Sequence, residues 1–212
     1  MAYDKAHTEE IIGSLEKIYP DPETELIFET PHQMLVATIL SAQATDKRVN
    51  LVTEDLFKKY RSVEDFAKAD WAELDSDIGS INFHRNKAKN IIGASREIME
   101  RYGGKVPSSM EELITLPGVA RKTANVVLFE AFHKNEGIAV DTHVIRLSGR
   151  LGMTVETDPK KIEADLMAET PQKDWGKLSD LLILHGRRVC TARKPRCAEC
   201  ILNKICPSAF KF

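Results

Sequence analysis

Residues 113–127 read Leu-Ile-Thr-Leu-Pro-Gly-Val-Ala-Arg-Lys-Thr-Ala-Asn-Val-Val, and this stretch decides how the rest of the chain is interpreted. It predicts two helices joined across Leu-Pro-Gly-Val-Ala, with the second helix beginning near Arg121. Gly118 lets the backbone approach a ligand closely, and the first amide groups of the second helix have no intrahelical acceptor. Helix starts of this kind bind phosphate oxygens, so the stretch predicts a phosphate-binding turn.

The same pattern is typical of a helix-hairpin-helix, which holds the DNA backbone and leaves the base sequence unread. We expect Gly118, Ala120 and Arg121 to contact DNA through this turn. The family that this hairpin resembles usually has a second glycine, as Gly-Val-Gly, at the position of Ala120. Alanine tolerates a right-handed backbone there but would be strained at a positive φ.

Lys122 falls in the first turn of the second helix. The positive end of the helix dipole disfavours the charged ammonium, so a lysine placed there could act as a neutral amine nucleophile. The alternative is a solvated surface charge, which is the commoner role of a first-turn lysine.

The segment Val-Asp-Thr-His-Val-Ile-Arg at 140–146 brings Asp141 to the start of another helix. An aspartate in this position is commonly the N-cap of the helix. A carboxylate facing a sugar C1′ could instead stabilise an oxocarbenium-like transition state and assist deprotonation of the lysine. We expect a structural role for His143.

Around these motifs, apolar residues recur at helical spacing along nearly the whole chain, as at Ile11, Ile12 and Leu15. No run alternates with period two, so the sequence predicts an all-α fold. Ser108 or Ser109, and Asp158, are expected to cap helices. No apolar stretch is long enough for a membrane helix, and the N-terminus lacks a secretory core. We expect a cytoplasmic protein, associated with the nucleoid if the source is prokaryotic.

The four cysteines all lie near the C-terminus, as Cys190, Cys197, Cys200 and Cys206. Reduced thiols clustered in this way indicate a metal site rather than disulfides. Four thiolates suit an iron-sulfur cluster, and a zinc ion is the alternative, although zinc sites usually have two short cysteine pairs.

Charge is distributed unevenly along a chain whose formal net charge is only −2. Among the charged residues of positions 1–30 most are acidic, whereas among those of positions 187–212 most are basic. Arg193, Lys194 and Arg196 lie in the short loop between two cysteines, where a fixed array of cations would suit phosphates. A solvated charged tail is the alternative interpretation.

Four motifs in one order resemble the iron-sulfur endonuclease III family of the helix-hairpin-helix DNA glycosylase superfamily. They are Leu-Ser-Ala-Gln-Ala-Thr-Asp at 40–46, the hairpin at 116–127, Val-Asp-Thr-His-Val at 140–144 and the cysteine spacing. The resemblance implies two helical domains with a DNA-binding cleft between them. Residues 24–134 would form a six-helix barrel domain containing the hairpin, and residues 1–23 and 135–212 the iron-sulfur cluster domain.

The activity that the resemblance implies is a bifunctional DNA glycosylase and AP lyase of base excision repair. Lys122 would be the Schiff-base nucleophile and Asp141 the catalytic carboxylate, and the four cysteines would bind a [4Fe-4S] cluster. The substrate would be double-stranded DNA that contains damaged (oxidised) pyrimidines or abasic sites, and the enzyme a monomer. Related adenine-mismatch enzymes typically have serine at the lysine position and thymine-mismatch enzymes have tyrosine.

The same motifs are compatible with three other interpretations of the chain. One is a mismatch or uracil glycosylase of the same superfamily, and another is an iron-sulfur protein that binds DNA without chemistry. An iron-sulfur redox carrier is a third, although the chain has no second cofactor motif.

Base flipping leaves a gap in the duplex, and the resemblance implies that Gln43 enters it while Phe83 presses on the opposite strand. The alternatives are a helix cap for Gln43 and a core aromatic for Phe83. Asn82 stands where the family usually has glycine, and we expect it to adopt the left-handed conformation of that turn. His84 stands where the family has tyrosine and is expected beside the lesion.

Overall fold

The structure is a computed structural model that describes residues 5–211, and all its regular secondary structure in that range is helical. The all-α prediction is therefore confirmed. The α-helices are α1 (Lys5–Glu16), α2 (Pro31–Ser41), α3 (Asp46–Lys59), α4 (Val63–Lys68), α5 (Trp71–Asp77), α6 (His84–Tyr102), α7 (Met110–Leu113), α8 (Arg121–Phe132), α9 (Thr142–Arg150), α10 (Pro159–Glu169) and α11 (Trp175–Arg188). Two 3₁₀ turns, η1 (Gln172–Asp174) and η2 (Cys197–Glu199), complete the set.

The chain folds into two compact units, residues 24–134 and residues 1–23 with 135–212. The unit of residues 24–134 contains α2 to α8, and α7 is a single turn of four residues that leads into the hairpin. This adds a short seventh helical segment to the six helices that the sequence predicts.

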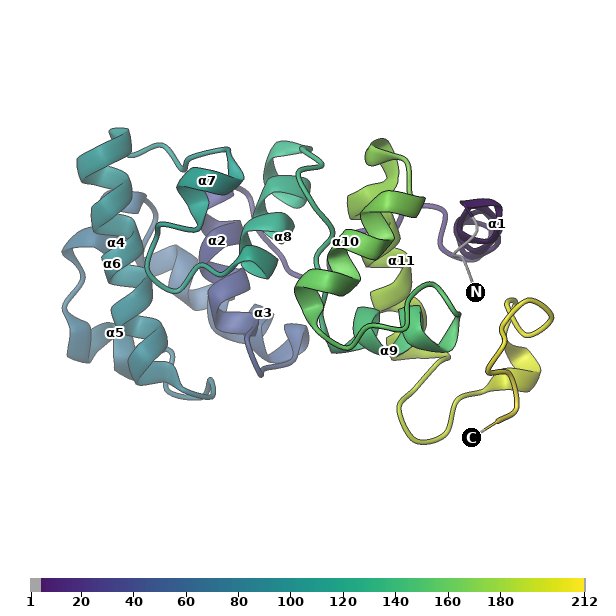
Figure 1. Ribbon diagram of the computed structural model, residues 1–212. Coiled ribbons are helices and arrows are strands. Elements are labelled where there is room, and N and C mark those ends of the chain that lie inside the picture. The colour runs from purple at the N-terminus through teal and green to yellow at the C-terminus, as the bar shows by residue number, and fades with distance from the viewer. Residues whose placement is uncertain (1–4, 212) are drawn as a thin grey trace. The chain divides into compact units, whose positions relative to one another are not determined.

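Helix α2 is the centre of this unit. Every residue from Met34 to Leu40 is buried, as expected for a helix that is apolar on all sides and surrounded by others. It packs against α3, α6 and α8, and Figure 1 shows α2 and α8 side by side. Helix α6 in turn contacts α4 and α5, so α6 connects the outer helices to the core.

Most helices begin at a polar residue whose side chain accepts a hydrogen bond from the first-turn backbone. The caps of α2, α3, α4, α5, α7, α9 and α10 are Thr30, Thr45, Ser62, Asp70, Ser109, Asp141 and Asp158. The predicted caps Ser109 and Asp158 are thus confirmed. Helices α6 and α8 begin differently, at Phe83 and Ala120, with no side-chain cap.

The unit of residues 1–23 and 135–212 has its own apolar core, in which α11 packs against α1 and α9. Helix α1 is linked to α11 by a hydrogen bond from Lys177 Nζ to Glu16 Oε1 at 2.8 Å. His7 Nε2 also lies 2.8 Å from the Leu151 carbonyl oxygen. These contacts explain why the N-terminal helix belongs with the C-terminal residues.

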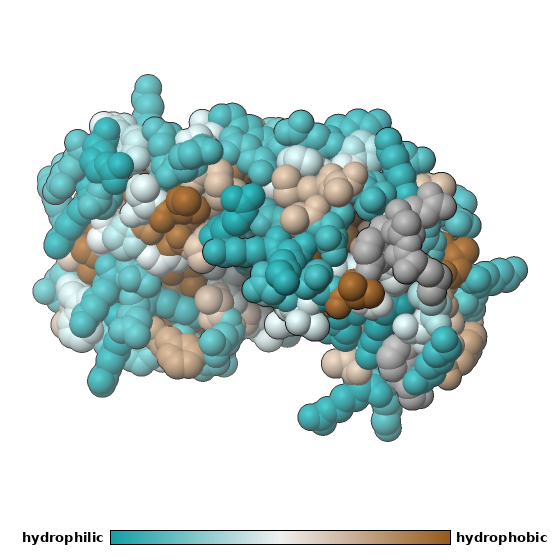
Figure 2. Space-filling model, viewed as in Figure 1, coloured by the Kyte–Doolittle hydropathy of each residue, from teal (hydrophilic) through white to brown (hydrophobic). Residues whose placement is uncertain are grey.

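Figure 2 shows one face of the molecule, on which hydrophilic residues cover most of the surface and apolar residues form small separate patches. None of the helices in residues 5–211 is long and apolar enough to cross a membrane.

Candidate catalytic and phosphate-binding site

The turn between α7 and α8 is held against α6 by close contact. Gly118 has φ +76°, and a Cβ on it would lie 2.7 Å from Cβ of Asn90. Pro117 packs on the same helix, because a Cβ on Gly93 would come within 3.2 Å of the proline ring. Glycine is therefore required at 118 both for its backbone conformation and for the space it leaves.

Ala120 precedes α8 with φ −89°, an extended conformation that any residue adopts. The second glycine that is usual in this hairpin is thus unnecessary here, and the alanine carries no strain. Because Ala120 offers no side-chain acceptor, the first amides of α8 remain directed outwards beside exposed Arg121. The turn has the geometry of a phosphate-binding helix start.

Lys122 is the second residue of α8 and is partly exposed. Within residues 5–211 its side chain makes no hydrogen bond or ion pair, so the amine is not held by the protein. Lys122 belongs to the unit of residues 24–134, whereas Asp141 belongs to the other unit.

Asp141 is the N-cap of α9. Its Oδ1 accepts hydrogen bonds from the backbone N–H groups of His143 at 2.7 Å and Val144 at 2.9 Å. The capping role is therefore real. It occupies one carboxylate oxygen and fixes the orientation of the group, which leaves the partly exposed carboxylate able to present its charge to a ligand.

His143 is part of a packed network behind this carboxylate. Arg146 Nη2 lies 3.0 Å from His143 Nδ1 and donates to the Gly186 carbonyl at the same distance. Burial lowers the pKa of His143; the Asp141 carboxylate opposes this shift, and the charge of Arg146 adds to it. Arg146 Nε also donates to the Cys190 carbonyl oxygen at 3.1 Å, so the network extends from Asp141 to the cysteines.

The four cysteines line a single small pocket. Burial raises the pKa of the Cys200 and Cys206 thiols, and the neighbouring thiols raise it further. Two nitrogen atoms face the sulfurs: Arg150 Nη1 donates to Cys190 Sγ at 3.3 Å, and His185 Nε2 lies 3.2 Å from Cys200 Sγ. Four cysteine sulfurs around one pocket, with an N–H donor directed at one of them, fit an iron-sulfur cluster, whose properties such hydrogen bonds tune.

Within residues 5–211, no three histidine, cysteine, aspartate or glutamate side chains converge closely enough to hold one metal ion. The four thiols are instead spread around the wall of their common pocket.

The basic loop between Cys190 and Cys197 is held by hydrogen bonds from Arg150. Arg150 donates to the carbonyl oxygens of Thr191 and Ala192, each at 2.9 Å. Arg193 and Lys194 are fully on the surface of this loop. Arg196 is also exposed, but it pairs with Glu199 at 3.1 Å and donates to the Arg188 carbonyl. Its charge is thus partly compensated within the protein.

Gln43 and Phe83 are both exposed residues in the left-handed conformation, with φ +58° and +59°. Phe83 is 61% exposed, so it is not a core aromatic. Gln43 does not cap a helix, because Thr45 caps α3. The expectation that Asn82 adopts the left-handed conformation is wrong, since the positive φ falls one residue later, at Phe83.

His84 opens α6 and is tied to the neighbouring helix α5. Its Nδ1 lies 2.5 Å from Asp75 Oδ1, and both side chains are largely covered. The histidine therefore supports the turn that carries Phe83.

Lys87 is a site residue that the sequence analysis missed. It is buried, and its Nζ donates to the carbonyl oxygens of Leu40 at 2.8 Å and Ala42 at 2.6 Å. Burial lowers its pKa. Its acceptors lie more than forty residues away in the chain. The only signal in the sequence is that Lys87 precedes Ala88 and Ile91 on the apolar face of α6.

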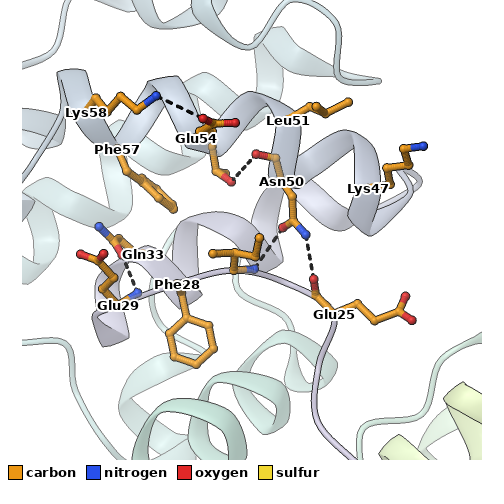
Figure 3. Close-up of a pocket in the computed structure, with 12 residues that line it drawn as sticks. Glu25, Phe28, Glu29, Gln33, Lys47, Asn50, Leu51, Glu54, Phe57 and Lys58 are labelled. Carbon is orange, nitrogen blue, oxygen red and sulfur yellow. Dashed lines mark hydrogen bonds and ion pairs between the residues drawn. The ribbon is translucent and has the colours of Figure 1, made fainter.

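A groove of about 750 Å³ lies elsewhere on the same unit, between residues 25–33 and α3 (Figure 3). Asn50 links the two sides of the groove: its Oδ1 accepts a hydrogen bond from the Ile27 amide at 3.0 Å, and its Nδ2 donates one to the Glu25 carbonyl oxygen at 2.7 Å. None of the predicted site residues lines it.

Two family models match this chain. The model described as HhH-GPD superfamily base excision DNA repair protein matches residues 36–172. The model described as iron-sulfur binding domain of endonuclease III matches residues 190–206. Together they include the hairpin, the Asp141 segment and all four cysteines.

The curated relatives of this chain are named endonuclease III. Endonuclease III of Synechocystis sp. is 56% identical over 209 residues, covering 99% of this chain and 95% of the relative. Endonuclease III of Bacillus subtilis is 48% identical, covering 89% of this chain and 86% of the relative. A solved structure of a trapped endonuclease III–DNA covalent intermediate is 40% identical with a TM-score of 0.93, covering 98% of this chain and 97% of that one.

Proposed function

The chain belongs to the endonuclease III family of the HhH-GPD superfamily of base excision DNA repair proteins, and from this we propose that Lys122 and Asp141 are its catalytic pair. The chain is a DNA glycosylase with AP lyase activity and binds a [4Fe-4S] cluster. The observation that carries the assignment of Lys122 is its position in the first turn of a helix start suited to phosphate, with an amine that has no partner among residues 5–211.

Lys122 acts as the nucleophile on the sugar of the damaged nucleotide. Its neutral amine attacks C1′, the bond from C1′ to the base breaks, and the base leaves with the electron pair and takes up a proton. The C1′–O4′ bond then breaks as one amine proton passes to O4′, and the opened sugar is joined to Nζ as a protonated Schiff base. Removal of a C2′ proton then expels the 3′ phosphate, which cuts the strand.

Asp141 stabilises the positive charge that develops on the sugar as the base departs. The two backbone hydrogen bonds to Oδ1 hold the carboxylate in one orientation, which supports a role that depends on position. A fixed charge in place before the reaction needs no reorganisation during it.

The phosphate contacts come from two loops. We assign the hairpin contact to Gly118, Ala120 and Arg121, whose amides and side chain face outwards. Exposed Arg193 and Lys194 supply the second contact, and Arg196 contributes less because it pairs with Glu199. Both contacts hold the backbone of any duplex and carry no base specificity.

The cluster is held by Cys190, Cys197, Cys200 and Cys206, whose thiols share one pocket. Cys190 and Cys197, at the two ends of the basic loop, would be ligands of the bound cluster, and this ligation would fix both ends of the loop. Arg150 completes the support of that loop through the Thr191 and Ala192 carbonyls. The loop is therefore held in one shape before DNA arrives, which reduces the entropy lost on binding.

Gln43 and Phe83 fill the gap that the flipped nucleotide leaves. Both side chains are exposed on left-handed turns, and such strained positions are common at functional sites. Phe83 can stack on bases as well as displace them. His84 holds the Phe83 turn by its contact with Asp75.

The substrate class is oxidised pyrimidines in double-stranded DNA, and the enzyme acts as a monomer. The presence of lysine at position 122 supports strand cleavage as well as base removal. We place the lyase amine and the gap-filling residues in a catalytic domain of residues 24–134. The carboxylate and the cluster belong to a second domain, residues 1–23 and 135–212.

A panel of duplexes tests this function. Each carries thymine glycol, uracil, a mismatched thymine or a preformed abasic site, and single-turnover cleavage is measured with and without alkali. We expect thymine glycol to be processed faster than uracil or mismatched thymine by about tenfold or more. The strand should be cut without alkali. Faster removal of uracil, or abasic sites that are cut only by alkali, would contradict the proposal.

A further inference from the structure

The two side chains assigned to the DNA gap come from loops that are bonded to each other. Gln43 lies between α2 and α3, and Phe83 lies at the start of α6. Asn82, next to Phe83, donates from Nδ2 to the carbonyl oxygen of Gln43 at 2.9 Å. The side chain of Asn82 is exposed, so this bond is not a by-product of core packing.

A second link is made one turn further into α6. Lys87 Nζ donates to the carbonyl oxygens of Leu40 and Ala42, at the end of the helix that leads to Gln43. The last carbonyls of a helix lack intrahelical donors, and a cation is favoured at that end of the helix dipole. Lys87 therefore completes the end of α2 from a neighbouring helix.

Both loop residues need such support, because a left-handed backbone is unfavourable for glutamine and more so for phenylalanine. Left free, each would sample other conformations and would lose that freedom on entering DNA. The bonds from Asn82 and Lys87 fix both turns before binding.

We infer that Asn82 and Lys87 are positioning residues that join the Gln43 and Phe83 loops into one rigid wedge, so that both side chains enter the DNA gap together. The inference rests on the proposed gap-filling role of these two residues. Neither positioning residue touches the lesion. Each acts through the backbone that carries Gln43.

Asn82→Ala is the variant that tests the wedge, because the residue is exposed and its loss should leave the fold intact. We expect the single-turnover rate of base removal from a thymine glycol duplex to fall by about five- to tenfold, the usual worth of one hydrogen bond. Melting temperature, binding to undamaged duplex and borohydride trapping on preformed abasic DNA should stay unchanged. The matched control is Asn86→Ala, an exposed asparagine in the first turn of α6, which should have the parent rate.

A double-mutant cycle with Gln43→Ala separates positioning from other causes. If Asn82 acts through Gln43, the loss of rate in the double variant should be smaller than the product of the two single losses. Multiplied effects, or an Asn82→Ala rate equal to that of the parent, would overturn the wedge while leaving the proposed function intact. A parent rate for Gln43→Ala would instead overturn the gap-filling role itself and, with it, the wedge.

Lys87→Met gives a second measurement. Its buried acceptors would lose their donor, so we expect a lower melting temperature together with slower base removal. Fluorescence of 2-aminopurine placed opposite the lesion should rise more slowly on mixing with either Asn82→Ala or Lys87→Met than with the parent protein. An unchanged rise in both would contradict a shared wedge.

Discussion

Helices α6 and α8 both begin without a side-chain cap, and both carry a lysine near the start, yet the two lysines have different surroundings. Lys87 is 6% exposed, and its ammonium is bound to the carbonyl oxygens of Leu40 and Ala42. Lys122 is partly exposed and has no hydrogen-bond partner among residues 5–211.

The comparison shows what separates a structural lysine from a chemical one. Burial lowers the pKa of Lys87, which by itself would favour a neutral amine, but its protons are directed at two acceptors and the group cannot reach a ligand. Lys122 is partly exposed in the first turn of α8, where phosphate is expected, and no side-chain partner among residues 5–211 holds its amine. The absence of a protein partner among residues 5–211 and the exposed location distinguish Lys122 from Lys87.

The largest effect is expected from removing the chemical amine. Lys122→Gln keeps a polar side chain of similar length, so the variant should still bind abasic DNA. Borohydride trapping should fall by about a thousandfold or more. Lys87→Gln, judged per folded molecule, should still trap. Equal loss of trapping in both variants would remove the distinction between the two helix starts.

Asp141→Asn should have the next largest effect, a fall in glycosylase turnover on the order of a hundredfold or more. Asparagine keeps an oxygen to cap α9, so the fold should be retained. Binding to DNA should be maintained or become tighter, because a negative charge near phosphates is lost. Turnover close to that of the parent protein would show that Asp141 only caps the helix.

Gly118→Ala tests how far the start of α8 depends on its turn. A Cβ there meets Asn90 at 2.7 Å, and the φ of +76° disfavours alanine. We expect about tenfold weaker binding to damaged and undamaged duplex alike, through loss of about one phosphate contact. Gly103→Ala is the control, since Gly103 also has a positive φ, of +59°, but open space around it. An equal loss of DNA binding in both variants would show that the close contact with Asn90 does not contribute to the effect of Gly118→Ala.

These differences also show which features the sequence could predict. The hairpin and the caps Ser109 and Asp158 were accessible because they depend on residues only a few positions apart. The role of Lys87 was not, because its acceptors are 45 and 47 residues away. A lysine on an apolar helix face has no local signal for what it binds.

The turn before α6 shows a subtler limit. Local preference favours asparagine over phenylalanine in the left-handed region, so the sequence predicts that conformation at Asn82. In the structure the side chain of Asn82 donates a hydrogen bond to the Gln43 carbonyl oxygen, and Phe83 adopts the left-handed conformation instead. A tertiary hydrogen bond thus outweighs a local preference.

A third helix start should affect the stability of the fold and not the reaction. His32, the second residue of α2, lies 2.9 Å from Ser95 Oγ, and burial lowers its pKa to about 4. The folded protein keeps this histidine neutral, whereas the unfolded chain takes up a proton near pH 6.5. The free energy of unfolding should therefore fall as the pH drops from about 6.5 to 4, by up to about 3 kcal/mol from this group.

Urea unfolding of the parent protein and His32→Asn across this pH range measures the contribution. The asparagine cannot titrate, so its unfolding free energy should decline less steeply than that of the parent. Parallel curves would show that His32 titrates alike in both states.

Locating the covalent bond to DNA tests the central claim most directly. The parent protein is mixed with abasic DNA, and borohydride reduces the Schiff base between them. The complex is then digested, and the modified peptide is identified by mass spectrometry. We predict that the sugar remnant is attached to Lys122. A remnant on Lys87, on another lysine or on the N-terminal amine would contradict the assignment of Lys122 as the nucleophile.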